Sequence, residues 1–237
     1  MTSTESWIVH KFGGSSVADA DCFQRVAAIV ESQKEPRLAV VLSACRGVTD
    51  ALLRLVALAE AQDDGYRGEL GQIRARHAAI AEAVLRPEAA RRYLAAFERD
   101  CHDIEGILHT VKLTRAAARN VSDLIVGYGE IWSTRLFHQM LEERGRRPGV
   151  VQWIDARQAV VVEWGALGPA VQWAESEAKL RELVAPDFRG TLVITGFIAS
   201  DRRGVQTTLG RNGSDFSASI FGALLGAREI HIWTDVD

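Results

Sequence analysis

The sequence predicts an α/β fold: a three-layer αβα sandwich built on a mainly parallel sheet, with a helical insertion. Two observations support this fold class. Short apolar runs rich in Val, Ile and Leu alternate along the chain with longer segments of helical periodicity, which is typical of strand–helix–strand units. Most of the apolar runs are continuous, as expected for parallel strands that are covered on both faces. The 237 residues, 47% of them hydrophobic, are enough for a sizeable core.

The expected elements follow one another in order. The strand-like runs are residues 7–12, 38–44, 150–154, 159–163, 191–199 and 229–234. The helical patterns are residues 18–34, 48–62, 69–85, 88–112, 121–144, 175–184 and 214–226. The section from about 48 to 146 is almost entirely helical, so we interpret it as an insertion packed against the sheet rather than a separate domain.

The domain organisation follows from the same pattern. Residues 1–6 are expected to form a polar tail, and residues 7–237 a single domain whose segment 190–237 carries much of the predicted site. The run 229–234 resembles a buried strand, yet only the residues DVD follow it. This favours a domain whose C-terminal part is missing from the chain, or an edge that a partner completes.

Composition and charge argue against several classes of protein. The net charge of −3 shows no electrostatic footprint for nucleic acid. No apolar stretch approaches the roughly 18 residues that span a bilayer, and the polar start MTSTESW is unlike a signal peptide. Cys22, Cys45 and Cys101 are far apart, which predicts reduced thiols in a cytoplasmic protein rather than a disulfide or zinc framework. The scattered histidines also predict no metal site.

The stretch KFGGSS, residues 11–16, ends an apolar run with a positive charge. Glycines after a strand allow a tight turn whose backbone N–H groups face an anion, and the helix that follows adds its positive dipole end. Lys11 would project from the carboxyl end of the strand, where open α/β sheets bind ligands. The combination suits a nucleotide triphosphate, although neither a Walker A motif nor G-x-G-x-x-G is present. A strand-to-helix turn with a surface-reaching lysine is the alternative.

Polar residues follow the second strand and interrupt a later helix. Ser43 ends the strand, and Thr49 either caps the next helix or faces the same crevice as Ser43. Glu130 and Ser133 lie three residues apart, on one face of an otherwise apolar helix. A buried carboxylate there needs a cationic partner. Glu130 is therefore expected either to hold a ligand's ammonium group or to form an internal salt bridge.

The stretch GFIASDRRGVQTTLGRNGSDFS, residues 196–217, is the richest in candidate ligand groups. Arg211 lies just before a helix and can hold a carboxylate through two parallel hydrogen bonds. Asp215, in the first helical turn, also fits ordinary dipole preferences. Thr234 and Asp235 close the last strand at the same carboxyl edge, where they could meet a nucleotide or magnesium. The whole inventory suits phosphoryl transfer onto a small zwitterionic acceptor.

The motifs resemble those of a known family. KFGGSSV, VVLSACRGVTD, VGYGEIWSTRLF, VQWIDAR, GFIASDRRGVQTTLGRNGSDFSA and IWTDVD are similar, in this order, to motifs of the aspartate kinases of the amino-acid kinase family. The likeness spans Lys11 to Asp237. It implies an amino-acid-kinase-like fold and the transfer of the γ-phosphate of ATP, with Mg²⁺, to the side-chain carboxylate of L-aspartate. That reaction opens the route to lysine, threonine and methionine.

The resemblance also implies a role for each matching residue. Lys11 would neutralise the phosphates, and Asp215 would orient it. The nucleotide-binding residues would be Lys11, Gly13, Gly14, Ser15, Ser16, Thr234 and Asp235. The aspartate-binding residues would be Ser43, Thr49, Glu130, Phe197, Arg211, Gly213 and Ser214. Among the latter, Glu130 would take the ammonium group and Arg211 the α-carboxylate.

The match departs from the family pattern in two places. Ser15 stands where the family usually has threonine, which keeps the hydroxyl. Family members continue past T-D-V with a D-P-R loop, a second lysine and regulatory ACT domains, which this sequence lacks. We therefore expect the isolated chain to keep most of the aspartate half of the site, only part of the ATP half, and no turnover. The full-length protein is expected to be a homo-oligomer, and a fusion with homoserine dehydrogenase stays open. A glutamate or acetylglutamate kinase, or a non-catalytic fragment, is the alternative.

Overall fold

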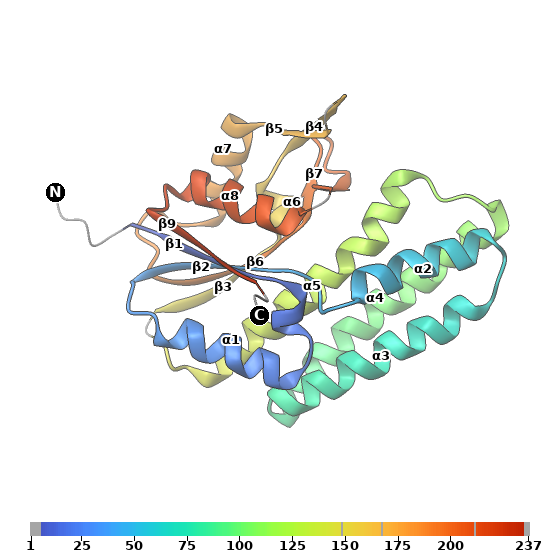
Figure 1. Cartoon of the computed structure of the whole chain (residues 1–237), viewed down its shortest axis with the longest axis horizontal. Coiled ribbons are helices and arrows are strands. Elements are labelled where there is room, and N and C mark those ends of the chain that lie inside the picture. The colour runs from blue at the N-terminus through green and yellow to red at the C-terminus, as the bar shows by residue number, and fades with distance from the viewer. Residues whose placement is uncertain (1–5, 148, 167, 211, 235–237) are drawn as a thin grey trace.

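A five-stranded parallel sheet lies at the centre of the molecule, in the order β3-β6-β2-β1-β9 (Figure 1). The computed structural model describes residues 6–147, 149–166, 168–210 and 212–234. The strands of the sheet are β1 (Ile8–Phe12), β2 (Arg37–Leu42), β3 (Val150–Ile154), β6 (Gly190–Thr195) and β9 (Glu229–Trp233). Phe12 pairs with Leu42, and Leu42 with Thr195, so the carboxyl ends of the three inner strands are level with one another.

Helices cover both faces of the sheet, which confirms the predicted αβα sandwich (Figure 1). One face carries α1 (Ala20–Ser32) and α5 (Arg119–Arg144), and the other carries α7 (Trp173–Leu183) and α8 (Gly213–Leu225). Side chains alternate along β1, so Ile8 and Phe12 join the core under α1 and α5, and Val9 joins the core under α8. Lys11 shares the face of Val9 and therefore points toward α8.

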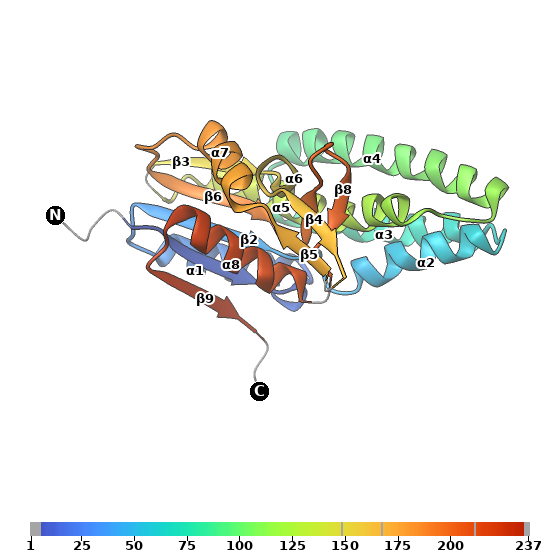
Figure 2. The same ribbon diagram turned by 90° about the horizontal axis from the view of Figure 1, so that it is seen from above.

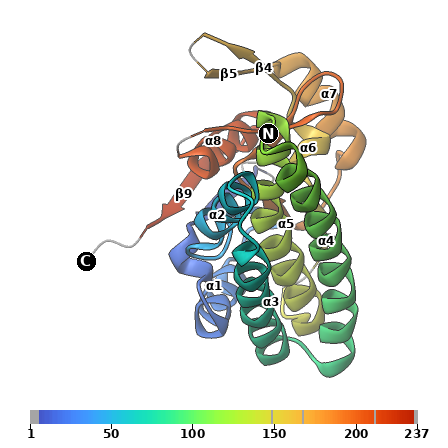
Figure 3. The same cartoon turned by 90° about the vertical axis from the view of Figure 1, so that its right-hand side faces the viewer.

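The long section between β2 and β3 is helical, as the composition predicted. It consists of α2 (Val48–Glu60), α3 (Gly65–Val84), α4 (Pro87–Thr114) and α5, which extend together to one side of the sheet (Figures 1 and 3). Its interior is aromatic: the rings of Phe97 and Trp132 meet edge to face at 4.7 Å, and His77 lies 5.1 Å from Phe97. Helix α5 packs against this bundle and also against one face of the sheet, so some of its residues reach the carboxyl edge of the sheet.

The prediction of a single strand over residues 191–199 is wrong in detail. The structure divides it into β6 and β7 (Ile198–Ser200), and β7 pairs with β8 (Gln206–Thr208) in a separate hairpin. Phe197 lies at the break with a φ of 66°. A left-handed residue cannot continue an extended strand, so the chain turns there, at the carboxyl edge of the sheet.

The expected strand 159–163 does not join the main sheet. Ala159 ends a short helix, α6 (Ala156–Ala159), and β4 (Val162–Gly165) pairs with β5 (Gly168–Val171) in a small hairpin. The side chain of Asp155 caps α6 by accepting the backbone N–H of Arg157, and this local hydrogen bond starts the helix.

The expected burial of the last strand is also wrong. β9 lies at the edge of the sheet (Figure 2). Its Ile230, Ile232 and Trp233 are 41%, 48% and 37% exposed, because no strand of the described sheet pairs with its outer edge.

None of the helices in the described ranges combines the length and the hydropathy that crossing a membrane requires.

Candidate active site

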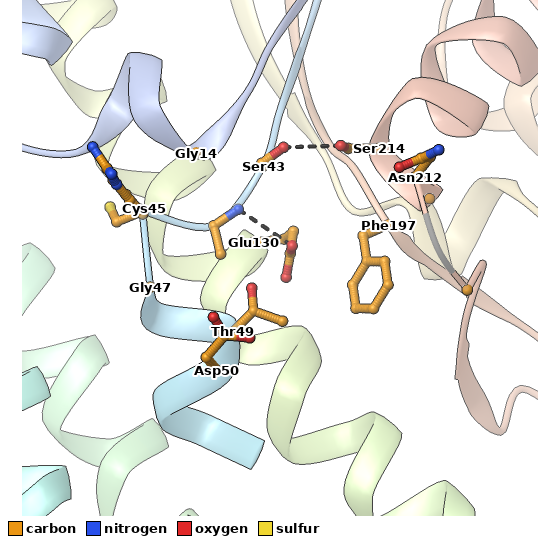
Figure 4. A pocket seen from close by; sticks show the side chains of 14 residues that line it. Gly14, Ser43, Cys45, Gly47, Thr49, Asp50, Glu130, Phe197, Asn212 and Ser214 are labelled. Carbon is orange, nitrogen blue, oxygen red and sulfur yellow. Dashed lines mark hydrogen bonds between the residues drawn. The ribbon is translucent and has the colours of Figure 1, made fainter. Parts of the chain in front are cut away.

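A pocket of about 530 Å³ opens at the carboxyl edge of the sheet (Figure 4). Its walls come from the turn after β1, the loop after β2, the middle of α5, the break after β6 and the start of α8. It is lined by most of the residues that the resemblance assigned to aspartate: Ser43, Thr49, Glu130, Phe197, Gly213 and Ser214. Arg211, assigned with them, lies outside the described residues, between pocket-lining Gly210 and Asn212.

Glu130 is the buried acid of this pocket, only 3% exposed. Its Oε1 accepts a hydrogen bond from the backbone N–H of Ala44 at 3.2 Å, and its Oε2 has no partner within the described ranges. Burial raises the pKa of Glu130 to about 8, against the opposing effect of the Ala44 N–H. The internal salt bridge is not formed with any cation that the structure describes, so that alternative is wrong there. One carboxylate oxygen remains available to a cationic ligand.

Two hydrogen bonds fix the end of β2 against its neighbours. The Ser43 hydroxyl donates to the hydroxyl of Ser214 at 2.9 Å, which joins the end of β2 to the start of α8 (Figure 4). The Ser133 hydroxyl donates to the carbonyl oxygen of Ser43 at 2.7 Å, which joins the same residue to α5. The pocket therefore has walls from three elements that are held together at one serine.

Thr49 does not cap α2, so that alternative is wrong. The N-cap is Gly47, which has a φ of 77° and offers no side chain. Thr49 lies one residue inside the helix and faces the pocket together with Asp50 (Figure 4). Because glycine adopts positive φ at little cost, the loop can turn sharply and present the first turn of α2 to a ligand.

Lys11 forms an ion pair with Asp215, with 2.6 Å between Nζ and Oδ1. The lysine side chain is 7% exposed and that of Asp215 40%, so the pair lies at the border between core and solvent. Glycine is required beside it: a Cβ on Gly14 would lie 2.8 Å from the carbonyl oxygen of Ala44. The backbone of the turn thus packs directly against the β2–α2 loop, which a larger residue would prevent.

The other predicted nucleotide-binding residues gather at a second cavity. Ser15 and Ser16 lie in the short 3₁₀ helix η1 (Gly14–Val17), and Thr234 directly follows β9. All three line a cavity of about 230 Å³ that also includes Arg25 of α1. They are brought together with one another but do not line the main pocket. Asp235 lies outside the described residues.

Two of the four described non-glycine residues with a positive φ line the pocket. Phe197 and Asn212 have φ values of 66° and 56°, in the left-handed region that costs most residues about 1 kcal/mol or more. Phe197 is held there because its N–H donates to the hydroxyl of Ser217 at 2.9 Å and its carbonyl accepts the N–H of Leu209 at 2.7 Å. A Cβ on Gly213 would lie 2.6 Å from the Phe197 ring, so the ring and the start of α8 fit closely.

Sequence reasoning missed several groups that line the pocket or bind its residues. Asn212 lines the pocket, and the signal for it was its place between Arg211 and Gly213, where asparagine readily adopts a left-handed φ. The N–H of Ala44 is the donor to Glu130, and no side-chain pattern indicates a backbone donor. Cys45 also lines the pocket as a buried free thiol, and burial raises its pKa to about 12.

Comparisons with known proteins agree with this geometry. Residues 6–237 match the model of the amino acid kinase family. The chain is 36% identical to the bifunctional aspartokinase/homoserine dehydrogenase 1 of Zea mays over 98% of its own length and 25% of that protein. It is 40% identical to the lysine-sensitive aspartokinase 3 of Escherichia coli over 97% of its own length and 49% of that protein.

A solved structure shows the same arrangement. Escherichia coli aspartokinase III in complex with aspartate and ADP superposes with a TM-score of 0.83 at 35% identity, covering 97% of this chain and 49% of that one. The chain thus spans between a quarter and a half of the length of these relatives.

Proposed function

Because the chain belongs to the amino acid kinase family, we propose that it is the kinase part of an aspartate kinase. The reaction would transfer the γ-phosphoryl group of ATP to the β-carboxylate of L-aspartate, giving 4-phospho-L-aspartate and ADP. The observation that carries this proposal is the pocket itself. It sets one buried carboxylate with an unpaired oxygen among hydroxyls, at the sheet edge where the Lys11–Asp215 pair also lies.

L-Aspartate suits this pocket as a doubly acidic molecule with one ammonium group. Its ammonium would bind the free oxygen of Glu130, which restores the charge that burial removes from the empty site. Arg211 would hold the α-carboxylate, since its neighbours Gly210 and Asn212 both line the pocket. The hydroxyls of Ser43 and Ser214 remain to orient the acceptor, and Phe197 closes one wall.

The acceptor carboxylate needs no general base, because it is already ionised at neutral pH. One of its oxygens attacks the γ-phosphorus while the bond to the β–γ bridging oxygen breaks, and ADP leaves with that electron pair. Lys11 would neutralise charge on the transferring phosphoryl group, with its Nζ held by Asp215. The Gly13-Gly14 turn would bring backbone N–H groups to the phosphates.

The remaining nucleotide contacts are assigned to Ser15, Ser16, Thr234 and Asp235. Mg²⁺ would enter the site with ATP and supply charge neutralisation for its phosphates. The relative from Escherichia coli described with aspartate and ADP supports this pair of substrates. A cytoplasmic location and a homo-oligomeric full-length protein belong to the same proposal.

A thermal-shift titration tests the substrate assignment. The ligands are L-aspartate, L-glutamate, N-acetylglutamate and Mg-ATP, added to the wild-type chain, to Arg211→Ala and to the matched control Arg203→Ala, which alters an exposed arginine of the β7–β8 turn. At a hundredfold excess over its dissociation constant, L-aspartate should raise the Tm of the wild type and of the control by about 5–10 °C. Arg211→Ala should show no such rise. A folded wild type that ignores L-aspartate and answers L-glutamate or N-acetylglutamate would contradict the proposal.

A further inference from the structure

One carboxylate outside the pocket joins α5 to the strand that leads into it. Asp123, in the second turn of α5, accepts hydrogen bonds from the hydroxyls of Thr207 and Thr208, both at 3.2 Å. Its side chain is only 14% exposed, and the two threonines are 6% and 8% exposed. A shielded carboxylate that receives two hydroxyl donors from consecutive residues of β8 holds that strand firmly, because hydrogen bonds to ionised groups are stronger than neutral ones.

Two aromatic and cationic contacts cover this junction. The indole N–H of Trp164, from the β4–β5 hairpin, donates to the Thr207 hydroxyl at 2.7 Å. The guanidinium of Arg119 lies 3.5 Å from the centre of the Trp164 ring and 3.7 Å from Asp123 Oδ2. The cation, the indole and the carboxylate therefore form one connected group.

Gln206, the residue before the two threonines, fixes the register of β8 on α5. Its amide nitrogen donates to the carbonyl oxygen of Asp123 at 2.6 Å, and its amide oxygen accepts from Arg157 at 2.8 Å. It fits against the helix at Gly127, where a Cβ would lie 2.0 Å from the amide nitrogen. A Cβ at that position would displace the Gln206 amide from the helix.

Helix α5 and the segment that follows β8 both line the proposed acceptor site. Glu130 follows Asp123 by seven residues, about two turns of α5. The pocket-lining residues Gly210, Asn212, Gly213 and Ser214 follow β8 directly. Any slip of β8 along α5 would therefore change the distance between the carboxylate that binds the ammonium group and the loop that faces the rest of the acceptor.

We propose that Asp123 is a positioning residue for the acceptor amino acid: by holding the hydroxyls of Thr207 and Thr208 it sets Gly210 and the start of α8 at a fixed distance from Glu130. Asp123 does not line the pocket, so it acts through the strand and not by contact with the ligand. The ligand named in this inference, L-aspartate, rests on the proposed function. We call the contacts that hold β8 on α5 the clamp. It consists of Asp123 with its neighbours Gln206 and Trp164, and it does not depend on the identity of the ligand.

Hydrogen exchange measured by mass spectrometry tests the clamp without any ligand. The variants are Asp123→Ala, the conservative Asp123→Asn, and Asp103→Ala as a matched control on an exposed carboxylate of α4. In Asp123→Ala, amides in 209–215 should exchange about tenfold faster or more, the factor given by losing one hydrogen bond to a charged group. Amides of β1, β2 and β6 should keep their wild-type rates. Asp123→Asn should accelerate exchange much less than Asp123→Ala, because its amide can still pair with both hydroxyls although the charge is lost.

Two results of this experiment would overturn the inference. One is an unchanged exchange rate in 209–215 of Asp123→Ala. The other is a uniform acceleration over the whole chain, since that would make Asp123 a general stability residue. Both outcomes are read without L-aspartate, so they stand whether or not the proposed function is correct.

A calorimetric titration with L-aspartate then connects the clamp to binding. We expect the dissociation constant to rise about tenfold or more in Asp123→Ala, and to stay within about threefold of wild type in Asp123→Asn and Asp103→Ala. An unchanged dissociation constant in Asp123→Ala would contradict the positioning role. A wild-type chain that binds no L-aspartate would contradict the proposed function instead, while the exchange rates would still decide the clamp.

Discussion

Replacing Glu130 by glutamine tests the electrostatic state of the empty pocket. In the folded chain the carboxyl holds its proton up to about pH 8, whereas in the unfolded chain it loses the proton near 4.5. Between these values the folded state binds more protons than the unfolded state, so the free energy of unfolding falls as pH rises. Glu130→Gln keeps the shape of the side chain and cannot ionise. The free energy of unfolding of the variant should therefore not fall in this way as pH rises.

The size of the effect follows from the raised pKa. At about 1.4 kcal/mol for each tenfold change, a rise from 4.5 to about 8 means that at most about 5 kcal/mol is lost between these pH values. In a chain of this size that corresponds to a difference of about 10–20 °C in Tm. Relative to wild type, Glu130→Gln should become steadily more stable from pH 5 to pH 8.

Thermal unfolding at half-unit steps of pH, for wild type and Glu130→Gln in parallel, measures this difference. Parallel curves over pH 5–8 would refute the reasoning, since they would mean that the carboxyl is already ionised in the folded chain. Ligand binding gives a second check. Because the ammonium group needs the ionised form, L-aspartate should bind about tenfold more tightly per pH unit between pH 6 and 7. Calorimetry in two buffers of different ionisation enthalpy should show proton release near pH 7.

Further predictions concern the lysine and the glycine turn. Lys11→Met should weaken Mg-ATP binding about tenfold or more in calorimetry, because it removes the cation that we propose to face the phosphates. It should leave L-aspartate binding within about threefold of wild type. Equal affinity of Mg-ATP for both chains would contradict the role of Lys11. Gly14→Ala should cost about 1–3 kcal/mol in urea unfolding, because its Cβ would lie 2.8 Å from the Ala44 carbonyl oxygen. Gly68→Ala, where a Cβ meets nothing within 4 Å on α3, should instead be neutral or stabilising, and equal losses in both variants would contradict the steric argument.

The layers of the fold were predictable because their signals are local. Short continuous apolar runs such as residues 38–42 favour strands buried on both faces, and the helical patterns between them have the right length to cross over. The position of Lys11 was predictable for the same reason, since a charge at the end of such a run falls at the carboxyl edge of the sheet.

The break at Phe197 was not predictable from local signals. The run 191–199 is apolar and rich in β-formers throughout, and the left-handed φ of Phe197 is imposed by hydrogen bonds to Leu209 and Ser217. These contacts cross 12 and 20 residues of chain, so no short window contains them. The error at 159–163 has a different cause: Asp155 caps the short helix α6 through Arg157, two residues away, and this local signal was overlooked in favour of the apolar run.

Some residues of the candidate site were likewise predictable from the sequence, and others were not. Residue types and motif order indicated Ser43, Glu130 and Ser214, which the fold brings to one pocket. The backbone donor at Ala44 and the clamp at Asp123 were not indicated. Asp123 and the threonines that it holds are 84 and 85 residues apart in sequence, and a carboxylate near a helix start is usually a solvated dipole partner.

Mapping L-aspartate onto the chain by ¹H–¹⁵N nuclear magnetic resonance tests the central claim most directly. With one saturable site, the backbone amide signals of Ala44, Glu130, Phe197 and Gly213 should shift together. Signals of the separate cavity around Arg157, which shares no lining residue with the pocket, should not shift. A folded chain whose shifts fall around Arg157, or whose spectrum does not respond to L-aspartate, would contradict the account.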